Sequence, residues 1–441
     1  MNRRTYLKQV ALMAAAGSFP AIFYPKSVLA AETEAQPAPT EGELATMDDS
    51  ARQFMGQYHV PGLSVAIARH GQFVYQKGFG YADKAAGEQV TPSHLFRIAS
   101  VSKPITSVAI FSLIEQGRLG LDDLVFGAQG LLKFDYGASY PDLVNKITLH
   151  HLLTHTCGGW EHEEGDPMFL NPAMNHKELI TWALQNQPLK FEPGTHYVYS
   201  NFGYCILGRV IEKISGQSYA EFVQQTVFAK CGIKDMRIAG NTYAQRASGE
   251  VVYYGQTGSG TNPYIMNITR LDSAGGWIGT PSDLVQFAMH VDGFKTTPNI
   301  LKADTIKTMT TASSVNPNYA CGWCVNSFPH WWHTGVLAGT ITHMVRAASG
   351  LCWAAFTNTR TVGMESAIDD MMWKMVKAVP AWHAWIEPPL QVSSTPAQDT
   401  QKTKAQPSAA ERLKELKDLY DQGLINKEIY DQKRQQILAS L

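Results

Sequence analysis

Runs of β-branched and aromatic residues occur at two places far apart in the chain, and each pair of runs flanks a turn that contains glycine. The first pair is 63–69 and 72–77 about His70-Gly71, and the second is 341–348 and 351–357 about Ser349-Gly350. Each pattern predicts a β-hairpin. The stretch 44–58 predicts a helix ahead of the first hairpin.

Between and after the hairpins the spacing of apolar residues is mostly helical. The predicted helices lie at about 103–117, 176–186, 202–215, 218–230, 281–292, 302–309 and 365–378. Strands at both ends with helices between them predict an α+β fold, in which one antiparallel sheet is assembled from the two ends of the domain. Helices flank this sheet, and a helical subdomain completes the site. The predicted domain covers residues 44–387.

The C-terminal part of the chain changes character. Residues 388–410 are rich in Pro, Ser, Thr, Gln and Ala, which is typical of a linker. Residues 411–441 carry two helical patterns, the first with a capping box of Ser408 and Glu411. This appended helical hairpin resembles the short two-helix module at the C-terminus of many bacterial proteins, which implies self-association or peptide contact. A solvated hairpin without a partner explains the pattern equally well.

Composition narrows the class of protein. The 441 residues include 37 Lys+Arg and 38 Asp+Glu, a formal net charge of -1, with 44% hydrophobic and 17% charged residues. These values exclude collagen-like, largely disordered and multi-spanning membrane proteins. Without a basic surplus we expect no nucleic-acid partner. Six cysteines in a chain with a core this large do not indicate a disulfide scaffold.

The N-terminus has the features of an export signal. The pair Arg3-Arg4 precedes an aromatic residue, a leucine and a lysine, and a mildly apolar stretch follows from Val10 to Tyr24. This resembles a twin-arginine signal, with a small-residue cleavage pattern that ends at Ala30. We therefore predict a signal over 1–30, a flexible lead-in over 31–43 and a periplasmic mature protein. The apolar stretch is too short and interrupted for a stable membrane span.

The first candidate for chemistry is Ser100-Val101-Ser102-Lys103, at the predicted start of a long helix. Side chains three residues apart share one helix face, so Ser100 and Lys103 can hydrogen-bond. A neutral lysine could take the serine proton, and the helix N-terminus would favour the developing negative charge. The motif alone is also explained by an N-cap serine and a surface lysine.

Tyr199-Ser200-Asn201 is the second candidate, just before the predicted helix at 202–215. A phenol near a lysine can carry a proton, because the positive neighbour lowers the cost of the phenolate. The Asn201 amide can hold a substrate carbonyl oxygen or orient the lysine. A turn tyrosine with a capping asparagine is the alternative.

His333-Thr334-Gly335 is the third candidate, directly before the second hairpin. Glycine allows the backbone to approach a ligand closely, so the amide of Val336 could point at an oxyanion beside the amide of Ser100. A loop histidine with satisfied hydrogen bonds is the alternative.

The order and spacing of the three motifs resemble serine β-lactamases and penicillin-binding proteins, and in detail the class C β-lactamase-related family of serine hydrolases. That family includes esterases and D-amino-acid peptidases. The resemblance covers roughly residues 44–380 and implies a serine β-lactamase/transpeptidase-like fold. Supporting segments are Phe96-Arg97-Ile98-Ala99, 147–159 with the sequence ITLHHLLTHTCGG, and Phe191-Glu192-Pro193-Gly194.

The resemblance implies a role for each motif residue. Ser100 is the nucleophile, Lys103 its activating partner, and Tyr199 the general base and acid. Asn201, His333, Thr334, Gly335 and Val336 contact the substrate or line the oxyanion hole, the latter formed by the amides of Ser100 and Val336. The implied mechanism is acylation of Ser100 and hydrolysis of the acyl-enzyme, with no cofactor and no metal.

Two positions depart from the family pattern. His333 stands where the β-lactamases carry lysine, and a histidine is charged only in part at neutral pH. Because a permanent charge suits the carboxylate of a penicillin, we expect poor antibiotic hydrolysis. Cys157 replaces a family serine, and without a mapped base it is a poor nucleophile.

Three other groups of residues, of histidine, cysteine and tryptophan, are candidates for a site but are assigned no catalytic role. His150, His151, His155 and His162 resemble a metal cluster, yet the first three fall in a structural segment of the family. Cys321 and Cys324 could form a strained disulfide, although buried thiols fit better. Some of five tryptophans could line an apolar pocket, the others being core: Trp160, Trp277, Trp323, Trp331 and Trp332.

The sequence therefore predicts an exported serine hydrolase that acts on an ester or amide, either a small molecule or a peptide derived from the cell wall. A catalytically slow binding protein and a true β-lactamase remain the alternatives. The absence of G-x-S-x-G argues against an ordinary α/β-hydrolase.

Overall fold

A computed structural model of the chain describes residues 38–162, 165–255 and 262–383, with the isolated positions 413, 417, 434 and 435. The predicted export signal and the linker lie outside these residues, as does the two-helix module apart from those four positions. All elements below belong to the first of the two units into which the chain divides, residues 1–390.

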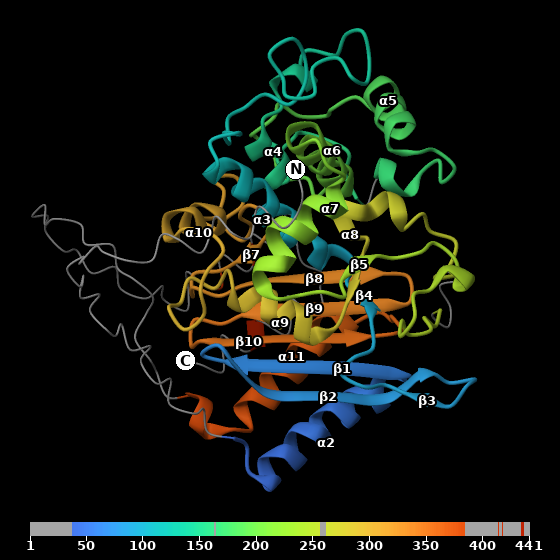
Figure 1. The fold of residues 1–441 in the computed structure, drawn as a ribbon, viewed down its shortest axis with the longest axis vertical. Coiled ribbons are helices and arrows are strands. Elements are labelled where there is room, and N and C mark those ends of the chain that lie inside the picture. The colour runs from blue at the N-terminus through green and yellow to red at the C-terminus, as the bar shows by residue number, and fades with distance from the viewer. Residues whose placement is uncertain are drawn as a thin grey trace, which may run out of the picture. The chain divides into compact units, whose positions relative to one another are not determined.

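Both ends of the described domain enter one antiparallel sheet of seven strands, in the order β3-β2-β1-β10-β9-β8-β7 (Figure 1). The strands are β1 (Gly62–Arg69), β2 (Gln72–Asp83), β3 (Glu88–Gln89), β7 (Cys324–Val325), β8 (Trp331–Leu337), β9 (Thr340–Arg346) and β10 (Leu351–Thr357). The two predicted hairpins, β1-β2 and β9-β10, meet where β1 pairs with β10 from Leu63–Thr357 to Arg69–Leu351. The α+β prediction, with one sheet assembled from both ends, is confirmed.

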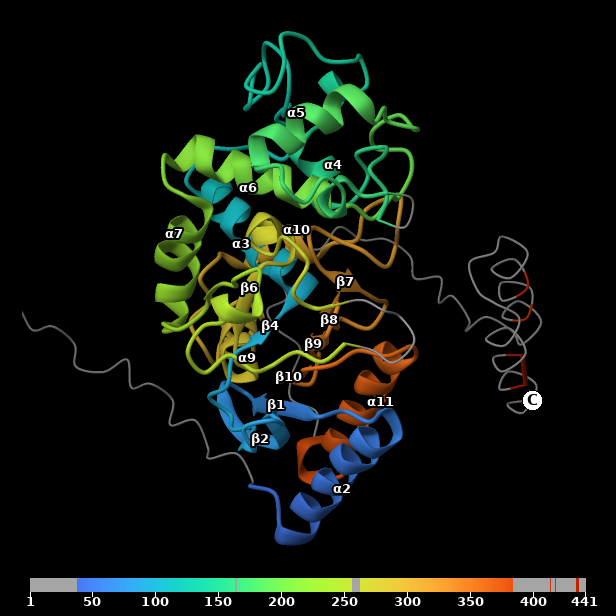
Figure 2. The ribbon, with the colours of Figure 1, turned by 90° about the vertical axis from the view of Figure 1, so that its right-hand side faces the viewer.

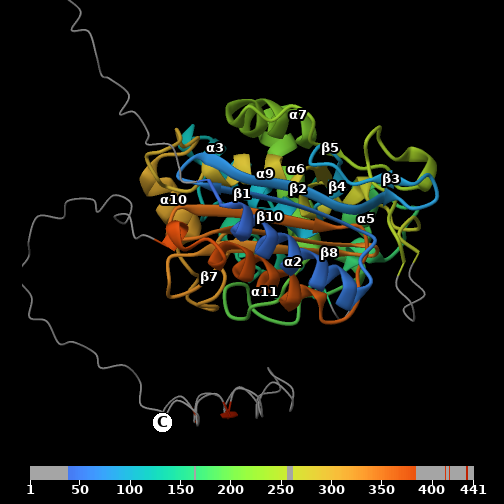
Figure 3. The ribbon, with the colours of Figure 1, turned by 90° about the horizontal axis from the view of Figure 1, so that it is seen from below.

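One face of the sheet is covered by α2 (Glu41–Tyr58) and α11 (Met364–Lys377), which lie side by side (Figure 3). Their buried side chains, such as Phe54 and Met372, form a core with the sheet. The helix α2 begins inside the predicted lead-in, because Thr40 and Glu43 form a capping box. This contact satisfies amides that a helix start leaves unpaired, which fixes the start before residue 44.

The other face carries α9 (Pro281–Met289) and, beyond it, the helical subdomain (Figure 2). The further helices are α3 (Ser102–Glu115), α4 (Leu149–Leu153), α5 (His176–Asn186), α6 (Asn201–Ser215), α7 (Tyr219–Val223), α8 (Asp272–Gly275) and α10 (Ala303–Thr310). The helix predicted at 218–230 is shorter than expected. After α7 the chain continues as a π turn, Gln224–Phe228, and a 3-10 turn, Ala229–Cys231.

A smaller sheet of β4 (Phe96–Arg97), β6 (Trp277–Gly279) and β5 (Arg237–Ile238) joins the subdomain to the segment before Ser100. The sequence did not predict these short strands, nor β8 as a strand. The stretch His333-Thr334-Gly335 interrupts the apolar pattern of β8, since His333 and Thr334 line the site and Gly335 packs against Ile98 and Ala99. No helix of the described residues is long and apolar enough to cross a membrane.

Candidate active site

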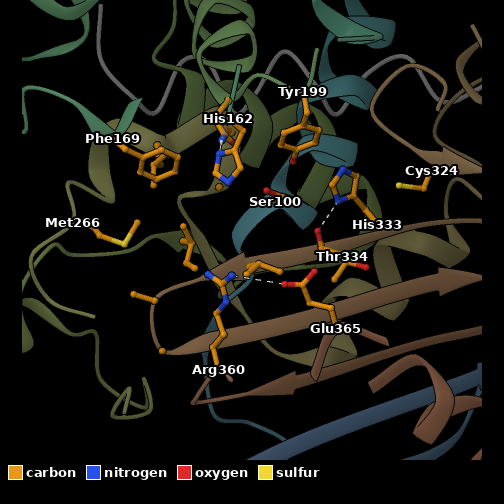
Figure 4. Close-up of a pocket in the computed structure, with 18 of the residues that line it drawn as sticks. Ser100, His162, Phe169, Tyr199, Met266, Cys324, His333, Thr334, Arg360 and Glu365 are labelled. Carbon is orange, nitrogen blue, oxygen red and sulfur yellow. Dashed lines mark hydrogen bonds and ion pairs between the residues drawn. The ribbon is translucent and has the colours of Figure 1, made fainter. Parts of the chain in front are cut away.

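Ser100 lies in a single 3-10 turn, Ala99–Val101, between β4 and the start of α3. The preceding Ala99 has a φ of 48°, in the left-handed region, so the chain turns sharply out of β4. Ile98, Ala99 and Val101 are buried, which holds this strained turn in place. The Ser100 side chain is left at the wall of a cavity of about 790 Å3 (Figure 4).

Lys103 lies beneath Ser100 and is fully buried. Its Nζ donates to Ser100 Oγ at 2.9 Å, to Asn201 Oδ1 at 2.7 Å and to the carbonyl oxygen of Ala274 at 2.9 Å. Burial lowers the pKa of the Lys103 ammonium to about 7, although the nearby Asp166 carboxylate opposes the shift. The alternative of a surface lysine is therefore wrong, and the neutral amine is accessible near pH 7.

The contacts of Lys103 fix where a neutral amine would point its lone pair. A neutral amine has two N–H groups, and both the carbonyl of Ala274 and Oδ1 of Asn201 can only accept. Asn201 presents Oδ1 because its Nδ2 donates to Asp166 Oδ2 at 3.1 Å. The two hydrogens are thus engaged, and the lone pair faces Ser100 Oγ.

Tyr199 covers the same lysine from the loop before α6. Lys103 Nζ lies 4.8 Å from the centroid of the Tyr199 ring, and the phenol interacts with the Ser100 side chain through a hydrogen bond. Burial keeps the pKa of the phenol well above its usual range, even though the bond to Ser100 lowers it. The positive neighbour therefore does not produce a resting phenolate, and Tyr199 holds its proton.

Asn201 is supported by Asp166, which was not singled out from the sequence, and by His162, which was noted only as part of a possible metal cluster. Asp166 is buried, and its Oδ2 accepts from the Asn201 backbone amide at 2.7 Å. His162 Nδ1 lies 3.0 Å from Asn201 Nδ2, and its ring lines the cavity. Both residues lie in a loop without periodic pattern, so the sequence carries no signal for their contacts with Asn201. The run Ser273-Ala274-Gly275-Gly276, in contrast, could have indicated a close approach of backbone to the site.

His333 is 3% exposed and is held by a continuous chain of hydrogen bonds. The amide of Ser200 donates to His155 Nδ1 at 3.2 Å, so His155 carries its hydrogen on Nε2, 3.2 Å from the hydroxyl of Tyr319. The Tyr319 hydroxyl then donates to His333 Nε2 at 3.1 Å, and His333 Nδ1 donates to the carbonyl of Thr334 at 2.8 Å.

This network keeps His333 neutral. Burial, together with the charge of Lys103, lowers the pKa of His333 to about 3. A partly charged histidine was expected from the sequence, and the buried environment removes that charge at neutral pH. Tyr319 was missed, because nothing in its local sequence distinguishes it from a core tyrosine.

Gly335 explains how β8 can lie against the turn that carries Ser100. A Cβ at this position would overlap the carbonyl oxygen of Ile98 and would lie 3.1 Å from Ala99 Cβ. Only glycine therefore permits this approach. The next residue, Val336, lines the cavity with Ser100, as the predicted oxyanion role of its amide requires.

The structure thus brings most of the candidate residues to one cavity. Its wall includes Ser100, Tyr199, Asn201, His333, Thr334 and Val336, with Lys103 beneath and Gly335 packed behind. None of the five tryptophans lines this cavity: Trp277 and Trp323 are core, and Trp332 lines a separate, smaller cavity beside α11. The apolar wall consists of Phe169, Met266, Leu271, Leu337 and Val362.

The remaining sequence clusters have ordinary partners. All six cysteines are free thiols, and burial raises the pKa of Cys157, Cys321 and Cys324 to about 12. These thiols are therefore poor nucleophiles. His151 belongs to the capping box of α4. Within the described ranges, no three His, Cys, Asp or Glu side chains form a group suited to a metal ion.

Comparison with known proteins agrees with this geometry. The profile of the family described as Beta-lactamase matches residues 47–372. The chain is 29% identical over 321 residues to penicillin-binding protein 4* of Bacillus subtilis, covering 66% of either protein. It is 32% identical over 205 residues to esterase EstB of Burkholderia gladioli, covering 43% of this chain and 50% of the esterase. The chain thus spans half to just under two thirds of the length of these relatives.

A solved structure shares the fold. The D-amino acid amidase from Ochrobactrum anthropi SV3 superposes with a TM-score of 0.63 at 21% sequence identity. The match covers 76% of this chain and 98% of the amidase. At this level of sequence identity the comparison shows a shared fold only.

Proposed function

The chain belongs to the beta-lactamase family, and from that premise we propose that it is a serine hydrolase that forms an acyl-enzyme on Ser100. The proposed substrate is an ester or amide, of the kind that esterases or D-amino-acid peptidases and amidases cleave. The contact that carries the proposal is the 2.9 Å hydrogen bond between Ser100 Oγ and a buried lysine whose lone pair has no other direction. The names of an esterase and of an amidase among the related proteins support this class.

In the proposed acylation, the neutral Lys103 amine takes the proton of Ser100 as Oγ attacks the carbonyl carbon. The backbone amides of Ser100 and Val336 stabilise the oxyanion. Tyr199 holds its proton at rest, so it can donate that proton to the leaving group. The proton on Lys103 then restores the phenol, and the acyl group remains on Ser100. Deacylation by water uses the same groups in reverse.

The neutral His333 argues against efficient hydrolysis of β-lactam antibiotics. The imidazole offers no positive charge to a substrate carboxylate at neutral pH, because its pKa is about 3. A slow binding protein is also disfavoured. A protein that only binds has no need to bury a lysine whose pKa falls to about 7 against a serine hydroxyl.

We also propose that the protein is exported to the periplasm by the twin-arginine-like segment 1–30, and that 411–441 is a self-association element. The mass of the protein recovered from the periplasm would test the first proposal, with an N-terminus at Ala31 expected. Comparison of the oligomeric state with that of a chain ending at 394 would test the second.

Labelling with a fluorophosphonate probe tests the proposed nucleophile. Intact mass spectrometry should find one adduct on the wild-type chain and none on Ser100→Ala. An adduct that persists in Ser100→Ala would place the reactive group elsewhere. If the folded wild-type chain neither forms an adduct nor hydrolyses phenyl esters, the hydrolase proposal is wrong.

A further inference from the structure

Thr334 lies between two cavities. It lines the cavity that contains Ser100, and it also lines a second cavity of about 250 Å3 beside α11. In the register of β8 and β9, His343 stands directly opposite Thr334. Opposed residues of an antiparallel pair project from the same face of the sheet, so their side chains can interact.

His343 connects Thr334 to α11. Its Nδ1 lies 3.2 Å from Thr334 Oγ1, and its Nε2 lies 3.0 Å from Asp369 Oδ1. The His343 side chain is 3% exposed, whereas the Asp369 side chain is 41% exposed. The contact between the two strands is therefore buried, and its carboxylate partner stands at the surface.

The donors and acceptors available on each side chain determine the direction of the Thr334–His343 and His343–Asp369 hydrogen bonds. An ionised carboxylate can only accept, so His343 Nε2 carries a hydrogen. In the neutral imidazole, Nδ1 then has only a lone pair. The hydroxyl hydrogen of Thr334 must point at Nδ1, which leaves the oxygen lone pairs of Thr334 for the cavity.

The neighbouring His333 does not supply a free proton donor in place of Thr334. His333 donates its single hydrogen to the backbone carbonyl of Thr334 and accepts from Tyr319. Arg360 also lines the cavity, and it forms an ion pair with Glu365 at 3.8 Å (Figure 4). The guanidinium keeps its N–H donors but its charge is balanced by Glu365, so on the side of His333 the wall presents the acceptor oxygen of Thr334.

In the proposed mechanism the leaving group lies against this wall. Figure 4 shows Tyr199, His333 and Thr334 on one side of Ser100, with Phe169 and Met266 on the other. Tyr199 is the proposed proton donor to the leaving group, so the leaving group must occupy its side of the nucleophile.

We propose that His343 and Asp369 are positioning residues that hold Thr334 as a hydrogen-bond acceptor, so that the site selects leaving groups bearing an N–H donor over leaving groups bearing a carboxylate. Carboxamides and ammonium groups are the favoured chemical classes. This inference rests on the proposed function, because it concerns the leaving-group side of the same hydrolase site.

A matched pair of phenyl esters tests the preference. The full chain is assayed with 3-carbamoylphenyl acetate and 3-carboxyphenyl acetate at pH 8.5. Each rate is divided by that of hydroxide hydrolysis, which removes the difference in leaving-group reactivity. We expect kcat/KM to be about tenfold higher for the carbamoyl ester. Its N–H group can donate to Thr334 Oγ1, whereas the carboxylate of the other ester would meet the oxygen lone pairs of Thr334. Equal turnover, or a preference for the carboxylate, would overturn the inference.

A pair of variants on α11 tests the positioning role. In Asp369→Lys the new side chain places donors against His343 Nε2, so the imidazole hydrogen moves to Nδ1 and the Thr334 hydroxyl hydrogen is released to the cavity. The preference for the carbamoyl ester should then fall at least fivefold. Asp370→Lys makes the same change of charge on the adjacent exposed residue and should keep the wild-type preference.

Other outcomes separate the two proposals. An unchanged preference in Asp369→Lys, or an equal change in Asp370→Lys, would refute the role of the His343–Asp369 pair while leaving the hydrolase intact. His343→Leu removes the acceptor for Thr334 and should also reduce the preference. If the wild-type chain hydrolyses neither ester and forms no fluorophosphonate adduct, the proposed function fails, and this inference fails with it.

Discussion

Burying Lys103 should make the stability of the protein depend on pH in a way that one substitution removes. The pKa of Lys103 falls from its ordinary value of 10.5 to about 7 in the folded chain. Between these values the unfolded chain binds more protons than the folded chain, so the free energy of unfolding rises with pH. The lysine costs the fold about 4 kcal/mol at pH 7 and about 2 kcal/mol at pH 9.

Lys103→Met keeps the length of the side chain and removes the titration. Relative to this variant, the wild-type chain should gain about 2 kcal/mol of stability from pH 7 to pH 9. The three lost hydrogen bonds change the level of stability but not its slope with pH. Urea unfolding of both chains at the two pH values, followed by tryptophan fluorescence, measures the difference.

The exposed Lys307 in α10 supplies the control. Lys307→Met replaces a solvated lysine, so its stability relative to wild type should not vary between pH 7 and pH 9. If the difference between wild type and Lys103→Met is equally constant, Lys103 remains charged in the folded chain. The assignment of its neutral amine as the base for Ser100 would then be wrong.

Four further outcomes follow from the site. The rate of Ser100 acylation by a phenyl ester should rise with pH around a midpoint of about 7 and then level off, because the base form of Lys103 is the neutral amine; a flat profile from pH 6 to 9 would contradict this. Tyr199→Phe should slow steady-state turnover by about 10²-fold, the usual scale for losing acid–base help; normal turnover would mean that another group protonates the leaving group. His333→Lys adds the charge that the neutral imidazole lacks, so nitrocefin hydrolysis should increase; no increase would refute the charge argument. Gly335→Ala should lower the stability by about 1–3 kcal/mol through overpacking against Ile98; an unchanged melting temperature in calorimetry would show that β8 can move away.

The sequence predicted those parts of the fold that depend on local pattern. The hairpins around Gly71 and Gly350 and the helix at 176–186 depend on turn residues and on periodicity within a few residues, and the structure has them. The strand β8 was missed because its residue types are determined by their contacts in the site and do not show the apolar pattern of a strand. The side chain of His333 is hydrogen-bonded to Tyr319, and position 335 is a glycine, whose lack of a side chain lets the backbone approach Ala99.

The site separates in the same way into local and non-local parts. Ser100 and Lys103 could be paired from sequence, since three residues on a helix fix their distance. What makes the lysine a base is its burial, together with an amide from Asn201 and a carbonyl from Ala274, 98 and 171 residues away. No local pattern encodes such contacts, because each is produced by the packing of α3 against α6 and α8. A motif can therefore identify the nucleophile, but the proton affinity of its partner is a property of the assembled core.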